Sequence, residues 1–254
     1  MAYNPTVKDI FEFIDSLAPF STQCDWDNSG MLVGDRNKTV RKIAVVLDIT
    51  TEAIEKAAEM NADLIVSHHP IIFRPARSFT DKDLPYVLAK NGIAAICTHT
   101  PLDMAKGGVN DTLSSVLGFE NPVPFAEEGD LAFIRVAEIP ATSGESLAKL
   151  CADKLSAVVR LADCGKTITK VAVCGGAGAE YLYDVAAAGC DAFITGDGKH
   201  HEFLDAKELG LTLIAAGHFE TENPVMTVLA NKLKEKFDAE VKIIPQTSPV
   251  VHIN

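Results

Sequence analysis

Several classes of chemistry are excluded by what is scarce in this chain of 254 residues. The six cysteines are scattered and no two form a CxxC pair, so neither a zinc ribbon nor a disulfide framework is predicted. The chain contains no GxSxG, and no cysteine borders a histidine, so no serine or cysteine nucleophile stands out. No apolar run approaches the ~20 residues that a membrane helix needs. The N-terminal MAYNPTVKD carries no secretory pattern, and we expect a cytoplasmic protein.

Basic residues are also in the minority. Against 35 Asp and Glu there are 23 Lys and Arg, which gives a formal net charge of −12. A protein without a clustered basic face releases few of the counterions that surround phosphate groups. We therefore expect neither a nucleic acid nor an anionic membrane as partner. The length allows one large or two small domains with a full core.

Apolar runs alternate with helical patterns along the first hundred or so residues. Predicted strands cover Lys42 to Asp48, Leu64 to Val66 and Ile93 to Cys97, with helices between them. This alternation predicts an α/β fold with a largely parallel sheet and right-handed crossovers. The pattern lapses at NPVPFAEEG, residues 121–129, so we predict domains at 1–124 and 125–254, with the C-terminal segment packing back on the first domain. Strands resume at Leu131 to Ala137.

The second half echoes the first. A shift of 128 residues lays KIAVVLDITTEAIEKAAEMNADLIVSHH on KVAVCGGAGAEYLYDVAAAGCDAFITGD, so that Asp63 falls on Asp191 and His69 on Asp197. Two strand–helix–strand units share apolar positions in any case, but a shift without gaps favours two similar α/β halves facing each other over one site.

Six of the seven histidines follow predicted strands or open the next helix. His68 and His69 come directly after a strand, and His99 and Asp103 follow another. In open α/β sheets ligands bind beyond the carboxyl ends of strands. His218 and Glu222, at i and i+4, share one face if a helix has begun there. HxxxE alone is typical of a helix surface, but together with the other strand ends it indicates a two-metal site with a carboxylate that can bridge.

Four motifs carry a family resemblance: DWDNSGMLVGD, SHHPIIF, THTPLD and AGHFETE. In order and spacing they resemble the NIF-three-like dinuclear-metal-centre proteins, often labelled GTP cyclohydrolase I type 2 homologues. The resemblance covers nearly the whole chain. It implies two similar α/β domains with the metal site in the cleft between them, assembled into a toroidal homohexamer. It also implies metal ligands at His68, His69, Asp103, His218 and Glu222, with Glu222 bridging.

The same resemblance implies catalytic roles beside the metals. His99 matches a position close to the ions, and a further histidine is expected before the last motif, where His200 and His201 are adjacent. We assign His99 and His201 as catalytic, although the sequence leaves open which of the adjacent pair faces the site. A ligand set of nitrogen and oxygen suits two divalent ions among Zn, Fe, Mn, Co and Ni.

The leading hypothesis is a metal-dependent hydrolase that uses a metal-bridging water and acts on GTP or another nucleotide or phosphoester. The alternative is a non-enzymatic metal-binding assembly or regulatory protein. Two further segments lie outside these hypotheses. The loop Gly175 to Gly178 is either a tight turn, which we favour, or an anion-binding loop. The polar CDWDNSGMLVGD is predicted to be a surface loop anchored by Trp26, the only tryptophan.

Overall fold

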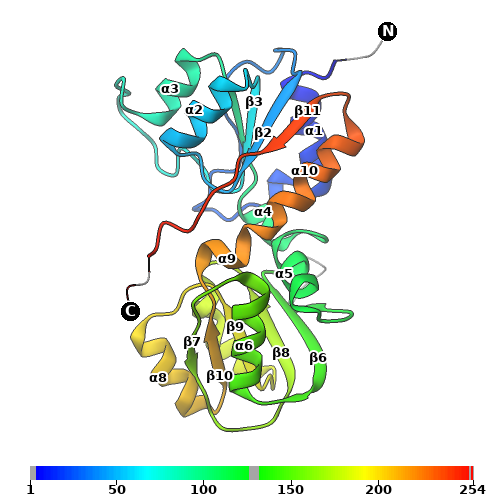
Figure 1. Ribbon diagram of the computed structural model, residues 1–254, viewed down its shortest axis with the longest axis vertical. Helices are drawn as coiled ribbons and strands as arrows, with labels where there is room; N and C mark the ends of the chain where they lie inside the picture. The colour runs from blue at the N-terminus through cyan, green and yellow to red at the C-terminus, as the bar shows by residue number, and fades with distance from the viewer. Residues whose placement is uncertain (1–3, 126–131, 252, 254) are drawn as a thin grey trace. The chain divides into compact units, whose positions relative to one another are not determined.

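The computed structural model describes residues 4–125, 132–251 and 253, and these form two compact units (Figure 1). The first unit contains the described residues up to Leu102 together with Met226–Gln246. The second contains those of Asp103–Val225 and those after Gln246. His252 and Leu131, the predicted start of a strand, lie outside the described residues. None of the helices in the described part of the chain is long and apolar enough to cross a membrane.

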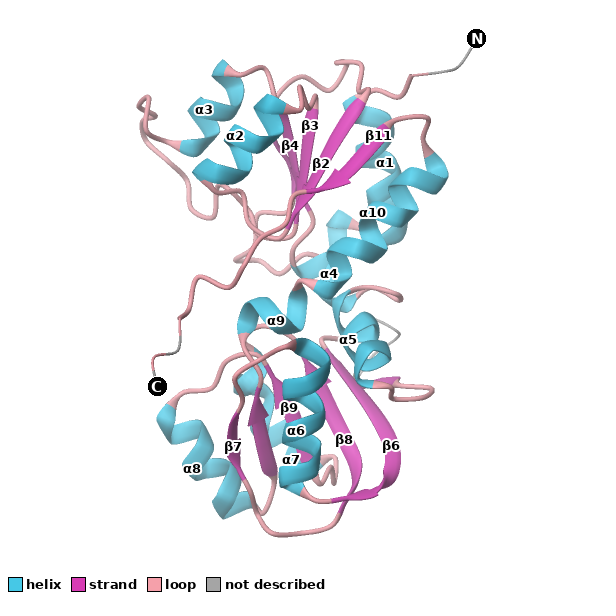
Figure 2. Cartoon of the chain, viewed as in Figure 1, coloured by secondary structure: helices cyan, strands magenta, loops and turns pink. Residues whose placement is uncertain are grey.

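The first unit is a five-stranded sheet with helices on both faces (Figure 2). Its strands, in spatial order, are β1 (Gly30–Val33), β4 (Ala94–Cys97), β3 (Leu64–Ser67), β2 (Lys42–Val46) and β11 (Glu240–Ile243). Only β1 is antiparallel to its neighbour. On one face lie α2 (Thr51–Glu59) and α3 (Leu84–Lys90), and on the other α1 (Val7–Leu17) and α10 (Pro224–Lys236).

Helix α1 shows how local sequence sets an element's start. The Thr6 side chain accepts a hydrogen bond from the backbone N–H of Asp9, and the Asp9 carboxylate accepts one from the backbone N–H of Thr6. This capping box satisfies two of the amides that a helix N-terminus leaves without partners. Val7, Ile10 and Ile14 then point into the core. The amphipathic first helix predicted from the sequence is confirmed.

The second unit is a six-stranded sheet, again covered on both faces. Its strands, in spatial order, are β5 (Val123–Phe125), β6 (Ile134–Thr142), β8 (Ile168–Cys174), β9 (Ala192–Thr195), β10 (Thr212–Ala215) and β7 (Arg160–Ala162). One core lies under α5 (Val109–Leu117) and α6 (Gly144–Leu155). The opposite core lies under α7 (Leu182–Ala187) and α8 (His200–Leu209). Strands β8, β9 and β10 run parallel, so the predicted α/β fold with mixed, largely parallel sheets is confirmed.

The sequence echo is a structural repeat. In β2 and β3, Ile43 pairs with Leu64. In β8 and β9, the residues that fall on them after the same shift, Val171 and Ala192, pair in the same way. A third parallel strand follows in each unit, β4 or β10, and an antiparallel strand flanks it, β1 or β7. The two halves therefore share four strands in one spatial order.

The division between the units differs from the predicted domain boundary after residue 124. The segment from Asp103 to that point belongs to the second unit, because Leu113 and Leu117 of α5 pack into its core. Met226–Gln246 belongs to the first unit, because β11 extends its sheet by pairing in parallel with β2. The lapse in pattern near residue 121 marks only the connection from α5 to the edge of the second sheet.

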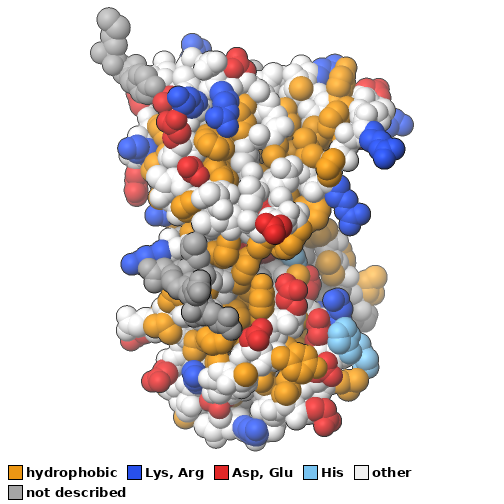
Figure 3. Space-filling model, turned by 180° about the vertical axis from the view of Figure 1, so that it is seen from behind, with side chains coloured by type: hydrophobic (Ala, Val, Ile, Leu, Met, Phe, Trp, Pro, Cys, Tyr) orange, Lys and Arg blue, Asp and Glu red, His pale blue; other side chains and the backbone are white. Residues whose placement is uncertain are grey.

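Charged side chains of both signs are interspersed over the face seen in Figure 3, and no continuous basic surface crosses the described residues of that face. The expectation that nucleic acid is not a partner stays a prediction.

Candidate metal centre

His68 and His69 directly follow strand β3, and hydrogen bonds fix the backbone of both residues. The His68 N–H donates to the carbonyl of Val46 at 3.3 Å, and the His69 N–H to that of Leu47 at 3.0 Å. His68 is completely buried and His69 is half-buried, with their ring centroids 4.9 Å apart. The strand thus presents two imidazoles at its carboxyl end, as the sequence predicted.

The ring nitrogens of this pair are oriented by hydrogen bonds. Nδ1 of His68 lies 3.0 Å from the carbonyl oxygen of Thr98, and Nδ1 of His69 lies 2.7 Å from Oδ1 of Asp48. A carbonyl oxygen only accepts, so Nδ1 of His68 carries the proton and Nε2 carries the lone pair in the neutral ring. Metal-binding histidines have this arrangement, in which the second nitrogen donates to a carbonyl or carboxylate.

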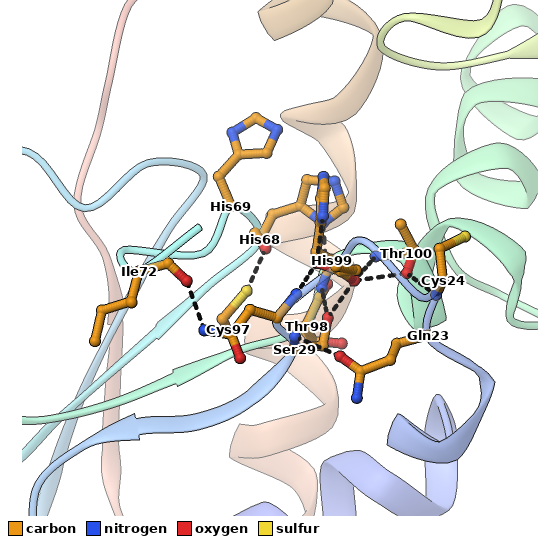
Figure 4. Close-up of polar contacts among 12 residues, drawn as sticks. Gln23, Cys24, Ser29, His68, His69, Ile72, Cys97, Thr98, His99 and Thr100 are labelled. Atoms are coloured by element: carbon orange, nitrogen blue, oxygen red, sulfur yellow. Dashed lines mark hydrogen bonds and ion pairs between the residues drawn. The ribbon is translucent and has the colours of Figure 1, made fainter. Parts of the chain in front are cut away.

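His99 follows the neighbouring strand β4 and completes a cluster of three histidines (Figure 4). Its ring centroid lies 5.3 Å from that of His68 and 5.5 Å from that of His69. One ring nitrogen from each of the three lies within 4.8 Å of the others, which is a spacing that could hold a metal ion. The first unit therefore brings together the three histidines that the sequence placed at two strand ends.

Asp27 holds His99 in place. Its Oδ1 lies 2.9 Å from Nδ1 of His99, and its Oδ2 accepts from the Thr100 hydroxyl at 2.6 Å and the Ser29 hydroxyl at 2.8 Å. Burial alone would raise the pKa of this carboxyl group. The hydrogen bonds from His99, Thr100 and Ser29, with the charge of His99, outweigh burial and hold the pKa well below its ordinary value.

This network corrects the prediction for the loop around Trp26. The Asp27 side chain has no exposed surface, whereas Trp26 is 57% exposed. The loop is therefore anchored by its carboxylate and not by its aromatic residue. An aspartate in a polar, turn-rich stretch gave no sequence signal for this role, because its partners lie about seventy residues further along the chain.

In the second unit, His218 and Glu222 lie on one face of α9 (His218–Glu222) after strand β10. Nε2 of His218 is 3.2 Å from Oε2 of Glu222, and Nδ1 of His218 is 2.7 Å from Oδ2 of Asp197. Glu222 is buried. Asp197 follows β9 and is the residue that matches His69 in the repeat. The i, i+4 pairing predicted from the sequence is confirmed, while the role of Asp197 was missed.

The glycine loop after β8 makes room for Glu222. Gly176 has a left-handed φ of +63°, and a Cβ there would overlap Oε1 of Glu222 and lie 3.3 Å from Nε2 of His218. Side chains of the fold occupy the loop amides: Gly175 N–H donates to Asn110 at 2.7 Å and Gly176 N–H to Thr221 at 3.0 Å. The tight-turn reading is therefore supported over the anion-binding one.

Asp103 lies near the end of α4 (Thr100–Met104) and is half-buried. Its carbonyl accepts from the Asn110 side chain at 3.1 Å. The carbonyl of the next residue, Met104, accepts from Arg135 at 2.9 Å. Arg135 is buried and forms an ion pair with Asp111. Neither Asn110 nor Arg135 was predicted as a site residue, although both hold the backbone around Asp103.

Cys174, at the end of β8, is not suited to be a ligand. Burial, with the negative charges of Asp103, Glu222 and Glu180, raises the pKa of its thiol well above the ordinary value. None of the candidate ligand groups among the described residues includes this thiol, and the candidate ligands of the second unit are oxygen and nitrogen atoms. This agrees with the predicted preference for divalent transition metals.

His200 and His201 open helix α8 and are exposed. Among the described residues of the second unit, neither forms a hydrogen bond or ion pair with His218 or Glu222. The structure thus gives the catalytic assignment of His201 no support, and that assignment stays a prediction.

These features define a class of α/β protein in which two similarly built units each carry imidazole and carboxylate groups at the carboxyl ends of parallel strands. The chain belongs to the Duf34/NIF3 (NGG1p interacting factor 3) family, whose model matches residues 5–249. The resemblance drawn from the four motifs is confirmed.

Individual relatives cover nearly the whole chain. The GTP cyclohydrolase 1 type 2 homologue of Clostridium perfringens is 36% identical over 250 residues, which cover 94% of this chain and 95% of that protein. Staphylococcus aureus protein SA1388 has a TM-score of 0.92 and 28% identity, covering 99% of this chain and 100% of that chain. Reduced HcgD from Methanocaldococcus jannaschii has a TM-score of 0.83 and 30% identity, covering 96% and 98%.

Proposed function

We propose that this protein binds two divalent transition-metal ions and is a metal-dependent hydrolase acting on GTP or another nucleotide or phosphoester. The proposed ligands are His68 and His69 from the first unit and Asp103, His218 and Glu222 from the second, with Glu222 bridging. The observation that carries the proposal is shared by the three proposed histidine ligands, His68, His69 and His218. Each has Nδ1 against a carbonyl or carboxylate oxygen, which directs the Nε2 lone pair outward as a ligand.

The residues fit such ions. In the second unit, Asp197 accepts a hydrogen bond from Nδ1–H of His218, so in the neutral ring Nε2 of His218 and Oε2 of Glu222 face each other as two acceptors at 3.2 Å. Two lone pairs at that distance repel unless a cation or a proton lies between them. Gly176 keeps the space beside the Glu222 carboxylate open. The donor atoms are nitrogen and oxygen, as Zn, Fe, Mn, Co and Ni accept.

His99 is the residue we propose for proton transfer. Two bound divalent ions would supply Lewis acidity and acidify a water molecule between them. His99 would accept a proton at Nε2 while the Asp27 carboxylate holds its Nδ1–H and stabilises the resulting imidazolium. Asp27 is thus a positioning residue. His201 remains a proposed second proton carrier that the same assay tests.

The experiment joins metal analysis with an activity screen. Purified protein reloaded with each candidate metal should contain about two ions per chain by elemental analysis, and should hydrolyse at least one member of a panel of nucleotides and phosphoesters. Glu222→Ala should lose metal and turnover. Glu220→Gln, in the same short helix, is the matched control and should keep both. One ion or none per chain would reject the dinuclear site.

Substitution of the proton carriers separates the two hypotheses. His99→Gln should retain two ions and lose most turnover, and His201→Gln tests the second assignment in the same way. A protein that keeps two ions but hydrolyses nothing in the panel would contradict the hydrolase. That result would favour the alternative, a metal-binding assembly or regulatory protein.

We also propose that the chain forms a closed homo-oligomer, a toroidal homohexamer, on the strength of the family alone. Light scattering at micromolar concentration should give a mass well above 27.2 kDa. A monomer mass would contradict this part of the proposal without affecting the metal site.

A further inference from the structure

Two exposed aromatic side chains flank the histidine cluster of the first unit. Trp26 is 57% exposed and Phe73 is 47% exposed, and their ring centroids are 6.0 Å apart. Both also contact His99, with centroids at 5.8 Å from Trp26 and 6.4 Å from Phe73. Single exposed apolar residues are common and need no explanation. Here two large rings lie against each other and against the residue proposed to move protons.

The backbone on both sides of this aromatic pair is fastened. The Asn28 side chain, two residues after Trp26, donates to the carbonyl of Ile72, next to Phe73, at 2.6 Å. Asp27 is buried among His99, Thr100 and Ser29. The two loops are therefore tied to each other and to the end of β4. Rings held in this way lose little conformational freedom when a flat ligand packs on them.

Two of the four residues that follow Phe73 are arginines. Arg74 and Arg77 are exposed in a chain of net charge −12, and neither forms an ion pair or hydrogen bond within the described residues. An arginine guanidinium pairs with phosphate through two parallel hydrogen bonds and stacks on flat rings. An aromatic pair followed by two arginines combines the two recognition elements that a nucleotide offers, a flat base and an anionic group.

We infer that Trp26 and Phe73 bind the planar heteroaromatic base of a nucleotide, and that Arg74 and Arg77 pair with its phosphate. This inference rests on the proposed function, because it names the substrate class for the same site. Trp26 belongs to the motif DWDNSG, Phe73 is the last residue of SHHPIIF, and the two arginines follow that motif. None of these four residues is among the proposed metal ligands.

The single tryptophan makes the test direct, since the intrinsic indole fluorescence reports Trp26 alone. The full chain, loaded with diamagnetic zinc and separately treated with chelator, is titrated with GMP, guanosine and ribose 5-phosphate. We expect saturable quenching by GMP, weaker binding of guanosine and no quenching by ribose 5-phosphate. Phe73→Ala should weaken GMP binding roughly 5- to 150-fold, the range measured for losing one base–aromatic stack.

Controls locate the effect. Phe79→Ala removes another exposed phenylalanine of the same loop, 49% exposed, and should leave GMP affinity unchanged. The Arg74→Gln/Arg77→Gln double variant should bind GMP no better than guanosine. All three variants should keep the metal content of the parent. Quenching without hydrolysis would leave this inference standing and count against the proposed hydrolase.

Several results would overturn the inference. No quenching by GMP, or equal quenching by ribose 5-phosphate, would mean that Trp26 does not stack on a base. Equal losses in Phe73→Ala and Phe79→Ala would show that the effect is not local to the pair. Trp26 emission that changes on dilution of the protein and ignores GMP would assign the aromatic pair to contact between copies of the chain.

Discussion

Asp63 and Asp191 accept equivalent hydrogen bonds from backbone N–H groups in the two units. Oδ2 of Asp63 accepts from the backbone N–H groups of Arg41 and Lys42 at 2.8 and 3.2 Å. Oδ2 of Asp191 accepts from those of Thr169 and Lys170 at 2.8 and 2.9 Å. Each carboxylate therefore ties the start of one parallel strand to the start of its neighbour, and each lies at the position onto which the repeat maps the other.

This equivalence predicts that removing either carboxylate lowers the free energy of unfolding by a similar amount. Asp63→Ala and Asp191→Ala should each lower the free energy of unfolding by about 1–3 kcal/mol, because two backbone amides lose a charged acceptor. Urea denaturation of each variant, compared with that of the exposed Asp81→Ala, measures the difference. Losses no larger than the control's would mean that these carboxylates do not hold the strand starts.

Gly176→Ala should remove metal without unfolding the protein. The new Cβ would overlap the Glu222 carboxylate, and the left-handed backbone adds about 1 kcal/mol of strain. The matched control is Gly189→Ala, which has a similar φ of +69° but no neighbour near a Cβ. We expect a similar loss of stability in both variants and a fall in metal per chain only at Gly176. Full metal content in Gly176→Ala would contradict the role of Glu222.

Asp27 predicts a dependence of stability on pH. Its pKa in the folded protein lies well below the unfolded value of about 3.9, so its contribution is complete above that pH and is lost as the pH falls toward the folded value. Asp27→Asn should lower the unfolding free energy of chelator-treated protein by about 2 kcal/mol at pH 7. The difference from the parent should shrink at pH 3.

Urea unfolding at pH 7, 4 and 3 supplies the comparison for Asp27. A difference that stays constant over this range would show that the charge of Asp27 is not what stabilises the loop.

Arg135 should be among the most sensitive positions in the second unit. Its side chain is 1% exposed and donates to Met104, Ala132 and Asp111. Arg135→Met leaves the Asp111 charge and two carbonyls without this partner, which should cost about 3–5 kcal/mol. Metal affinity should also fall, because Asp103 precedes Met104. Arg41→Met, at an exposed arginine, is the control for both measurements, and an equal effect there would contradict the anchoring role.

Much of the site could be predicted because its residues lie next to strong local patterns. His68, His69 and His99 follow short apolar runs, and a short apolar run followed by polar groups marks a strand end. His218 and Glu222 are related by helix periodicity within five residues. The register of the repeat could be predicted for the same reason, since a shift without gaps carries one strand pair onto the other.

The rest depends on contacts between distant parts of the chain. Asp27 is one aspartate among several in a turn-rich loop, and only its contacts with His99 and Thr100 set it apart. Arg135 interrupts an apolar run, and its burial depends on Asp111, 24 positions away. The second unit starts at Asp103, before the predicted boundary, because Leu113 and Leu117 of α5 pack into the core of a sheet whose strands come later in the chain.

That pairing of β11 with β2 has a consequence for synthesis. The second unit's strands are contiguous in the chain, whereas the first unit is completed only by Met226–Gln246. Domains fold as units while the chain leaves the ribosome, N-terminal parts first. In this protein the N-terminal unit is completed late: its first strands keep an unpaired β2 edge and a face without α10 until Met226–Gln246 has been synthesised. A nascent chain stalled before residue 226 would thus hold every strand of the second sheet, together with a first sheet whose exposed β2 edge favours aggregation.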